Sequence, residues 1–422
     1  MQRSILVGTA RPRSLRATLD RIDPQRAAMP GHTPLRVLAI DIEGGHGGSS
    51  RSLAQMLHAI DLDAVSVEVW CRRGGAIEAS YQAHGIPVRV TPDMPRLTVL
   101  ERNSRNLIDI AGFFGRRWPR SAAFRASLLE KLATVDLLHL NHVSLFWLAR
   151  WIRRRLPSFP ITMHIRTQPV DGPTARWQAR VARAVCSRFV FISENERDHL
   201  ARQSGGSPNG EVIYNPVAVD RIAAADNAGL VAVCLSNFSY GRGIDRLASV
   251  AAELDKRGDR SVRFVVAGDM QLTRTLPGAL GVVAREGGDL ADFMAREGVA
   301  PRFEFLGHVD DPEALLQRSD ILLKPTREDN PWGRDILEAL GHGVPVASVG
   351  SYDRFVETGS TGLLQRRFDA AALADWLIEL AEDKPRLEAM RTTSADRIAA
   401  LCDPQRQAAA LARFWRDTVA AG

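Results

Sequence analysis

Short apolar runs alternate with amphipathic stretches along most of the chain. The first run, Leu35–Ile42, is followed by a glycine-rich loop and by a segment of helical periodicity that starts at Ser49 or Ser50 and reaches about residue 60. Further runs of strand character are 65–71, 87–91, 136–141, 159–165 and 188–193, and helical patterns lie at 103–117, 121–134, 144–155 and 174–185. Strands that alternate with helices predict an α/β fold with a parallel sheet.

The alternation starts again after Asn215-Pro216. New strands are predicted at 230–235, 263–268, 303–306, 321–324 and 345–349, with helices between them and two or three more from residue 370 to the C-terminus. Two doubly wound, Rossmann-like domains that face a central ligand cleft fit this pattern better than one very large sheet. We expect a flexible basic extension over 1–33, domains over 34–217 and 218–400, and a C-terminal helix over 401–422 that could cross back to the first domain.

Composition excludes several classes of protein. The chain has 422 residues, of which 45% are hydrophobic and 25% charged, a profile typical of a soluble protein of two or three domains. Its four cysteines lie far apart without a Cys-x-x-Cys pair, which argues against a zinc site and a disulfide framework. No apolar run approaches the ~20 residues of a membrane span, and the run at 5–10 is too short for a signal peptide. We therefore expect a cytoplasmic protein.

The net charge of +6 is unevenly distributed. Residues 1–33 carry +4, residues 34–95 carry −2, residues 96–188 carry +12 and residues 189–422 carry −8. A protein that coats nucleic acid would not concentrate its positive charge in one short stretch and leave an acidic second half. No nucleic-acid partner is therefore expected.

A glycine-rich loop follows the first predicted strand. Its residues Gly44, Gly45, Gly47 and Gly48 would let backbone N–H groups approach an anion at the start of a helix. The spacing fits neither the dinucleotide-binding fingerprint nor a P-loop. Taken alone, a plain tight turn explains the glycines equally well.

Histidines end two of the predicted buried strands. His164 would project toward the cleft, although a core histidine bonded to a carbonyl group is the simpler interpretation of an isolated residue. His139 and His142 could bind a metal only with a third converging ligand, and the sequence shows none.

The first loop of the second domain combines a cation with glycine. Arg242 lies between Gly241 and Gly243, a few residues after Asn237 and just before a predicted helix. A guanidinium beside free N–H groups suits a diphosphate, and a solvated arginine in a turn is the alternative.

The most informative motif runs from residue 324 to residue 346. A strand ends at Lys324, a polar loop follows, a helix starts near Gly333, and Glu338 lies about one turn into it. Carboxylates and amides near a helix start can bind sugar hydroxyls, while N–H groups of the loop face a phosphate.

Together these motifs resemble those of the family 4 glycosyltransferases, retaining enzymes of the GT-B fold that use nucleotide sugars without a metal. The resemblance covers roughly residues 35–400, and its strongest segment, 330–346, is similar to the family's Glu-x7-Glu block followed by Glu-Ala-x-x-x-Gly-x-Pro-Val. It implies that Glu338 bonds the nucleotide ribose. Asn330 stands where the family has a donor-sugar glutamate and cannot supply a carboxylate.

The resemblance implies further roles. The glycine loop would lie near the donor phosphates and the acceptor, and Arg242 on the diphosphate; the family's second phosphate cation falls near Ser236. His164 would be the catalytic residue, which orients the sugar or the acceptor near the anomeric centre. The implied reaction is transfer with retention in a dry cleft, where Arg242, Lys324 and helix N-termini stabilise the departing diphosphate. The nucleotide sugar is the donor substrate, and no cofactor or metal is implied.

Two other functions fit parts of the pattern. A nucleotide-sugar epimerase of similar architecture would be expected to lack the Glu338 segment. A non-catalytic GT-B protein that binds a glycan or a partner is compatible with Asn330 and Ser236.

The basic segment 96–188 interleaves arginines with aromatic residues, most densely at Arg116, Arg117, Trp118 and Arg120. This pattern is typical of helices at an anionic bilayer surface, and solvated helix faces are the alternative. Because the resemblance implies a saccharide or lipid-linked acceptor, we expect an enzyme of bacterial cell-surface polysaccharide, lipopolysaccharide or glycolipid synthesis at the inner face of the plasma membrane.

Overall fold

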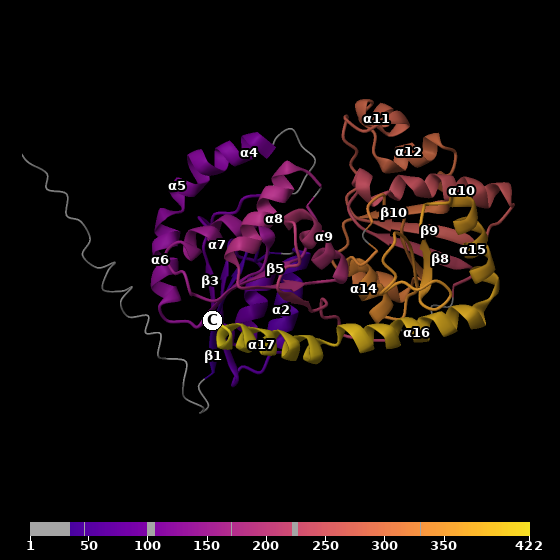
Figure 1. The fold of residues 1–422 in the computed structure, drawn as a ribbon. Coiled ribbons are helices and arrows are strands. Elements are labelled where there is room, and N and C mark those ends of the chain that lie inside the picture. The colour runs from indigo at the N-terminus through magenta and orange to yellow at the C-terminus, as the bar shows by residue number, and fades with distance from the viewer. Residues whose placement is uncertain (1–33, 46, 99–105, 170, 222–226, 330) are drawn as a thin grey trace, which may run out of the picture. The chain divides into compact units, whose positions relative to one another are not determined.

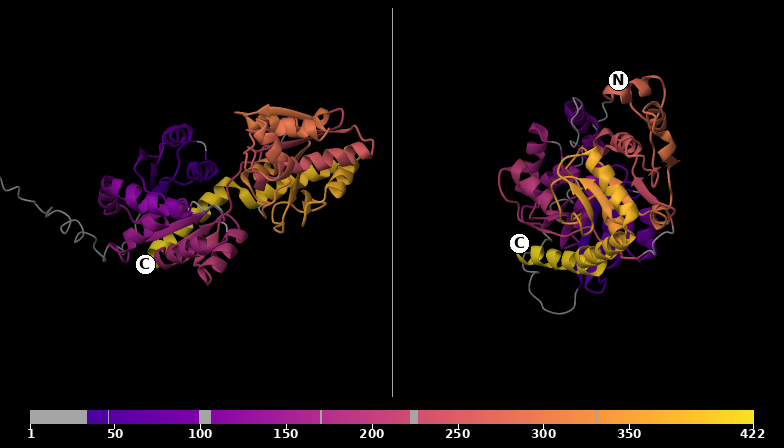
Figure 2. Two further views of the ribbon diagram at one scale, coloured as in Figure 1. Left: turned by 90° about the horizontal axis from the view of Figure 1, so that it is seen from above. Right: turned by 90° about the vertical axis from the view of Figure 1, so that its right-hand side faces the viewer.

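A computed structural model of the chain describes residues 34–45, 47–98, 106–169, 171–221, 227–329 and 331–422. The predicted extension over 1–33 lies outside the described residues. The chain divides into two compact units (Figure 1): the first consists of the residues up to Pro216 together with Pro404–Gly422, and the second of Val217–Asp403. The last helix, α17 (Pro404–Ala420), therefore belongs to the first unit, where it packs on α2 (Gly48–His58). Figure 2 shows this yellow helix beside the strands of that unit.

The first unit is built on a parallel sheet in the order β3-β2-β1-β4-β5-β6-β7. Its strands are β1 (Leu35–Asp41), β2 (Val65–Cys71), β3 (Val88–Val90), β4 (Leu137–Leu140), β5 (Ile161–Ile165), β6 (Arg188–Phe191) and β7 (Gly210–Val212).

Side-chain alternation along β1 explains how helices cover both faces of this sheet. Leu38 and Ile40 pack with α6 (Ala122–Leu132), α7 (Phe146–Arg153), α8 (Pro173–Val185) and α9 (Glu194–Ser204). Val37 and Ala39 point the other way and pack with α2, α3 (Ala76–Ala83) and α17. Before α6 the chain forms α4 (Asn106–Gly112), a π-helical segment (Phe113–Arg117) and α5 (Trp118–Arg120).

The second unit repeats the architecture with the strand order β10-β9-β8-β11-β12-β13. Its strands are β8 (Leu230–Leu235), β9 (Val262–Ala267), β10 (Phe303–Gly307), β11 (Ile321–Lys324), β12 (Val346–Val349) and β13 (Gly362–Gln365). Helices α10 (Leu247–Lys256) and α15 (Ala370–Glu382) pack together on one face, and α14 (Arg334–Gly341) and α16 (Lys384–Cys402) on the other (Figure 1). The remaining helices are α11 (Gly278–Arg285), α12 (Leu290–Arg296) and α13 (Pro312–Gln317).

Both sheets reverse their strand order at the centre. In the first sheet the chain leaves β1 toward β2 and returns to β4 on the other side of β1; in the second it leaves β8 toward β9 and returns to β11. Ligands of doubly wound sheets bind beyond the carboxyl ends of the strands at such a reversal. The loops that follow β1, β4, β8 and β11 are therefore where a site is expected.

Candidate active site

The glycine loop lies at the reversal point of the first sheet. A Cβ on Gly44 would lie 1.9 Å from the carbonyl oxygen of Arg73, so the position requires glycine. A Cβ on Gly45 or Gly48 would have no atom within 4 Å, and on Gly47 the nearest would be 3.4 Å away. No side chain caps α2 at Gly47, and its first turn holds no acidic residue. The loop thus leaves open space at the positive end of a helix.

His164 is buried in β5 and does not reach the surface. Arg166 donates a hydrogen bond from Nη2 to His164 Nδ1 at 3.1 Å, and because arginine only donates, the imidazole proton lies on Nε2. Burial and then the charge of Arg166 hold the pKa of His164 well below its usual value. The ring is therefore neutral, and its Nε2 has no hydrogen-bond partner among the described residues.

Arg166 is the centre of a buried polar network. Its Nε donates to Asn141 Oδ1 at 2.7 Å and its Nη1 to Asn215 Oδ1 at 2.8 Å. The amide of Asn141 in turn donates to Asp41 Oδ1 at 3.2 Å, and Ser50 Oγ donates to the same oxygen at 2.8 Å. The network thus joins the carboxyl ends of β1, β4 and β5 to the first turn of α2.

Burial sets the protonation of this network. It raises the pKa of Asp41, while the bonds from Ser50 and Asn141 and the charge of Arg166 act in the opposite direction. His139, on the neighbouring strand, accepts a hydrogen bond from Trp415 Nε1 of α17 at 3.2 Å, and burial lowers its pKa to about 3. Helix α17 therefore contributes directly to the polar layer of the first sheet.

Arg242 lies on the loop after β8, at the reversal point of the second sheet. Its exposed guanidinium donates to Ser236 Oγ at 2.6 Å and to the Asn237 carbonyl at 3.0 Å, both neutral acceptors. The side chain of Asn237 accepts from the Asp269 N–H at 2.9 Å and so holds this loop on the end of β9. No ion pair of Arg242 occurs within the described residues, and its charge faces solvent.

Lys324 ends β11 beside the start of α14. Its ammonium contacts Asp335 Oδ1 at 2.9 Å. A Cβ on Gly333 would lie 2.0 Å from Lys324 Nζ, so glycine at the start of α14 lets the ammonium approach. Glu338, one turn further, pairs with Arg334 Nε at 2.8 Å. Asn330, in the preceding loop, lies outside the described residues.

Sequence reasoning missed Arg327, which fastens the two loops of this unit together. Its guanidinium binds both carboxylate oxygens of Asp245, at 2.8 and 2.6 Å, and lies 3.9 Å from the centre of the Tyr240 ring. The backbone N–H of Arg327 also donates a hydrogen bond to the Gly241 carbonyl at 2.7 Å. These contacts hold the Arg242 loop against the loop after Lys324.

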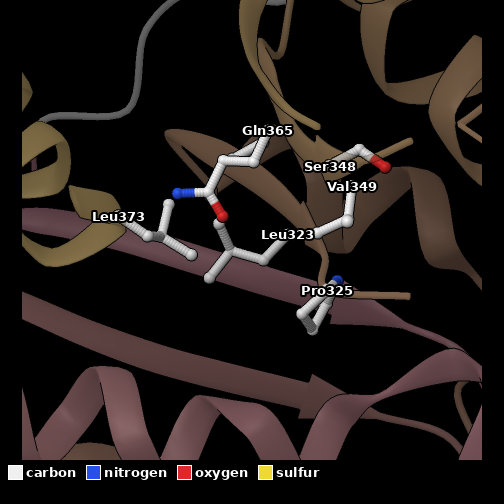
Figure 3. A pocket seen from close by; sticks show the side chains of 7 residues that line it. Leu323, Pro325, Ser348, Val349, Gln365 and Leu373 are labelled. Carbon is white, nitrogen blue, oxygen red and sulfur yellow. The ribbon is translucent and has the colours of Figure 1, made fainter. Parts of the chain in front are cut away.

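A small pocket lies at the ends of β11, β12 and β13 and includes Leu323 and Pro325, the chain neighbours of Lys324 (Figure 3). It is lined by apolar side chains at the ends of β11 and β12, by Gln365 of β13 and by Leu373 of α15. Its polar groups are satisfied: Ser348 Oγ donates to the Lys324 carbonyl at 3.2 Å, and the Gln365 amide bonds the backbone of Asp369. The two polar side chains that line the pocket are therefore already bonded to the protein.

The arginine- and aromatic-rich segment forms one cluster on the first unit. Arg116, Arg117 and Arg120 are exposed. Trp118 is half-buried between Phe113 and Trp151, with the Arg125 guanidinium 4.3 Å above its ring. Leu107 and Ile108 project outward, at 75% and 70% exposure, and Phe114 is 37% exposed.

The described part of the chain contains neither a candidate metal site nor a candidate membrane-spanning helix. It holds no group of three or more histidine, cysteine, aspartate or glutamate side chains placed to bind a metal ion. None of its helices is both long and apolar enough to cross a membrane.

Both units match families of known proteins. The family profile described as Glycosyltransferase Family 4 matches residues 46–221, and that described as Glycosyl transferases group 1 matches residues 229–383. The alpha-D-kanosaminyltransferase of Streptomyces kanamyceticus is 23% identical over 292 residues, which cover 65% of this chain and 69% of the relative. The D-inositol 3-phosphate glycosyltransferase of Nocardia farcinica is 30% identical over 182 residues, 40% of this chain and 38% of the relative.

The fold matches solved structures over nearly its whole length. The crystal structure of Anabaena HepE in complex with UDP-glucose aligns with a TM-score of 0.67 at 20% identity and covers 89% of this chain and 99% of that protein. The two family profiles follow one another along the chain, one on each doubly wound unit. The chain belongs to the family 4 glycosyltransferases and has their GT-B fold of two Rossmann-like domains.

Proposed function

We propose that this glycosyltransferase moves a sugar from a nucleotide-sugar donor to a saccharide or lipid-linked acceptor, with retention of the anomeric configuration. The observation that carries the proposal is the pair of cations, Arg242 and Lys324, at the reversal point of the second sheet and beside the start of α14. A departing diphosphate gains negative charge as the glycosidic bond breaks, and fixed cations with helix N–H groups stabilise that charge. The solved complex of HepE with UDP-glucose supports a nucleotide-sugar donor.

The donor-binding residues are assigned by their chemistry. Arg242 and Lys324 bind the diphosphate, with Asn237 holding the Arg242 loop in place. Gly333 admits the ammonium of Lys324, and Glu338 accepts hydrogen bonds from the ribose hydroxyls. Asn330 is assigned to a hydroxyl of the transferred sugar on the resemblance alone.

The first unit supplies the acceptor side. The open positions Gly45, Gly47 and Gly48 let an anionic or hydroxyl group approach the start of α2. His164 is a positioning residue in this proposal, because it is buried and touches Arg166 instead of solvent. The chain's own cations replace a metal ion as the counter-charge of the leaving group.

Turnover of candidate donors tests the proposal. The full chain is mixed with a panel of nucleotide sugars and with soluble or lipid-linked acceptors, in EDTA and in Mg²⁺, and release of nucleoside diphosphate is measured. One donor should release its nucleoside diphosphate in EDTA only when an acceptor is present, and the anomeric proton coupling of the product should match that of the donor. An inverted product, or an epimerised nucleotide sugar without release, contradicts the proposal.

Alanine at Gly48 should separate binding from folding at the glycine loop. Because a Cβ there meets no protein atom, the free energy of unfolding should stay the same or rise by up to about 1 kcal/mol. The methyl group would obstruct the approach of a ligand to the helix start, so kcat/KM should fall at least about tenfold. Chemical denaturation and steady-state kinetics measure the two effects.

Gly44→Ala is the matched variant for this test. Its Cβ would meet the Arg73 carbonyl at 1.9 Å, and it should lower the free energy of unfolding by about 1–3 kcal/mol. If Gly48→Ala keeps full activity, the loop is a plain turn that does not bind a ligand.

The arginine- and aromatic-rich cluster is proposed to hold the enzyme on the anionic inner surface of a bacterial plasma membrane, where it would work in the synthesis of a cell-surface glycan or glycolipid. Exposed Leu107 and Ile108 on α4 accompany the exposed cations Arg116, Arg117 and Arg120. Apolar side chains that enter the lipid headgroup region beside basic residues favour a peripheral membrane contact.

Replacing Arg116 and Arg117 by glutamine should weaken binding to phosphatidylglycerol vesicles by about 30-fold, since each basic residue near such a surface contributes ~1 kcal/mol. Sedimentation with vesicles of stated composition measures the partition. The matched control is Arg413→Gln/Arg416→Gln on α17, which removes the same charge from exposed positions on the helix that covers the other face of the sheet. Equal loss in both variants would mean that net charge alone, and not this cluster, governs binding.

A further inference from the structure

Three arginines gather at the carboxyl edge of the first sheet, outside the residues assigned so far. Arg72 and Arg73 directly follow β2 and pack against the glycine loop: the Arg72 N–H donates to the Asp41 carbonyl at 3.1 Å, and the Arg73 carbonyl touches Gly44. Arg96 comes from the segment after β3, which is fixed by buried Leu97, whose N–H donates to the Ser144 carbonyl at 2.9 Å. Two separate stretches of chain thus place three guanidinium groups beside the open end of α2.

Among the described residues, one carboxylate pairs with this arginine cluster. Glu43 lies 3.1 Å from Arg96 Nη1 and 3.9 Å from Arg73 Nη1. The Nε and Nη1 atoms of Arg72 are buried and have no hydrogen-bond partner within the described residues. Other arginines of the same unit differ: Arg36 pairs with Asp136 and Arg188 with Glu211, each with a carboxylate of its own.

The electrostatic surroundings of Arg72 agree with this geometry. Burial, followed by the charge of Arg96, lowers the pKa of Arg72; Arg73 and Arg117 act in the same direction, and Glu43 opposes them. Like charges held this close repel one another and cost stability in the absence of a counter-ion. Such a cost is expected where a ligand supplies the missing negative charge.

We propose that Arg72, Arg73 and Arg96 form a binding site for a phosphate or diphosphate group of the acceptor. Guanidinium groups bind phosphate oxygens through paired, charge-assisted hydrogen bonds. The side chains of Arg73 and Arg96 are 62% and 29% exposed, so both are open to a ligand from solvent. The site lies beside the glycine loop, where the acceptor is expected to bind. The assignment of this phosphate to the acceptor rests on the proposed function, whereas the phosphate site itself does not.

Binding of inorganic pyrophosphate tests the site independently of catalysis. The experiment uses the full chain with Arg242→Met/Lys324→Met, so that the cations of the second unit do not contribute. Adding Arg73→Gln/Arg96→Gln should weaken pyrophosphate binding in calorimetric titration at least tenfold. Arg89→Gln, an exposed arginine on β3 outside the cluster, should leave the affinity unchanged.

A second variant is expected to increase the affinity for pyrophosphate, which distinguishes loss of the site from misfolding. Glu43→Gln removes the competing carboxylate, so pyrophosphate should bind several-fold more tightly, an effect that structural damage does not produce. Vesicles of phosphatidylglycerol, compared with phosphatidylcholine, identify the source of the phosphate. The proposal is overturned if Arg73→Gln/Arg96→Gln binds pyrophosphate as the parent does, or if it loses only vesicle binding, which would assign the cluster to lipid headgroups.

Discussion

Replacing Lys324 with methionine should lower kcat/KM for the nucleotide-sugar donor by about 10²–10³-fold, the usual effect of removing one fixed group that stabilises developing charge. Methionine keeps an apolar stem of similar length, and the lost group is the ammonium that lies 2.9 Å from Asp335 at the start of α14. The fold should survive, because Asp335 would remain at a helix N-terminus, where a carboxylate is favourable. Steady-state kinetics on the donor identified by turnover measure the effect.

Asp335→Asn is the control for this prediction. It removes the partner of Lys324 and leaves the ammonium for the diphosphate alone, so the KM for the donor should fall or stay the same. If Lys324→Met instead keeps kcat/KM within about threefold of the wild type, the ammonium makes no contact that is specific to the transition state.

Replacing Arg166 with methionine should lower the free energy of unfolding of the first unit by about 3–5 kcal/mol near pH 8, the cost of breaking a buried charge network. The variant loses the bonds to Asn141, Asn215 and His164, and it leaves the buried carboxyl of Asp41 without its cation. Guanidinium unfolding followed by tryptophan fluorescence suits the measurement, because six of the eight tryptophans lie in the first unit.

The loss in free energy of unfolding that Arg166→Met causes should grow with pH. Burial raises the pKa of Asp41 in the folded protein. The contribution of Asp41 to stability is therefore fully present at a pH below the pKa that it has in the unfolded chain, and it is lost as the pH rises through the pKa that it has in the folded protein. Removing Arg166 raises the pKa of Asp41 further, and the difference between wild type and variant should therefore widen from pH 5 to pH 8. In Asp41→Asn/Arg166→Met the part of this pH dependence that comes from Asp41 should disappear, and what remains comes from His164, whose pKa the charge of Arg166 also lowers. A deficit that does not change with pH would show that Arg166 does not stabilise the Asp41 carboxylate.

Most inner strands could be predicted from the sequence, because they appear as largely apolar runs; β2 carries the polar residues Ser66 and Glu68 only at its two positions that are not buried. The runs at 65–71, 230–235 and 321–324 match β2, β8 and β11 residue for residue. The edge strands β7 and β13 were missed, since they are short, are not fully buried and have mixed composition. Helix α9 was missed because it is strongly polar; the run predicted as a strand to residue 193 ends at Phe191, and Ser193 caps that helix, accepting from the Asn195 N–H.

The candidate site was predictable only where a motif is local. Glycines beside a helix start and the block from Lys324 to Glu338 are contiguous in sequence, and the strand order brings each to a reversal point of its sheet. The partners of Arg166 were not predictable, because Asn141 and Asn215 lie 25 and 49 residues away from it and carry no periodic pattern. For the same reason nothing in the sequence joins Arg72 to Arg96 across an intervening helix and strand.

Binding of nucleoside diphosphates to the full chain tests the central claim most directly: that the carboxyl ends of β8 and β11 hold the donor diphosphate. UDP, GDP and ADP are titrated by calorimetry into the wild type and into Arg242→Met/Lys324→Met. One of them should bind the wild type, and the double variant should bind it on the order of 30-fold or more weakly, as expected for the loss of about 2 kcal/mol of charge-assisted hydrogen bonding. Equal affinity for both proteins would contradict the account.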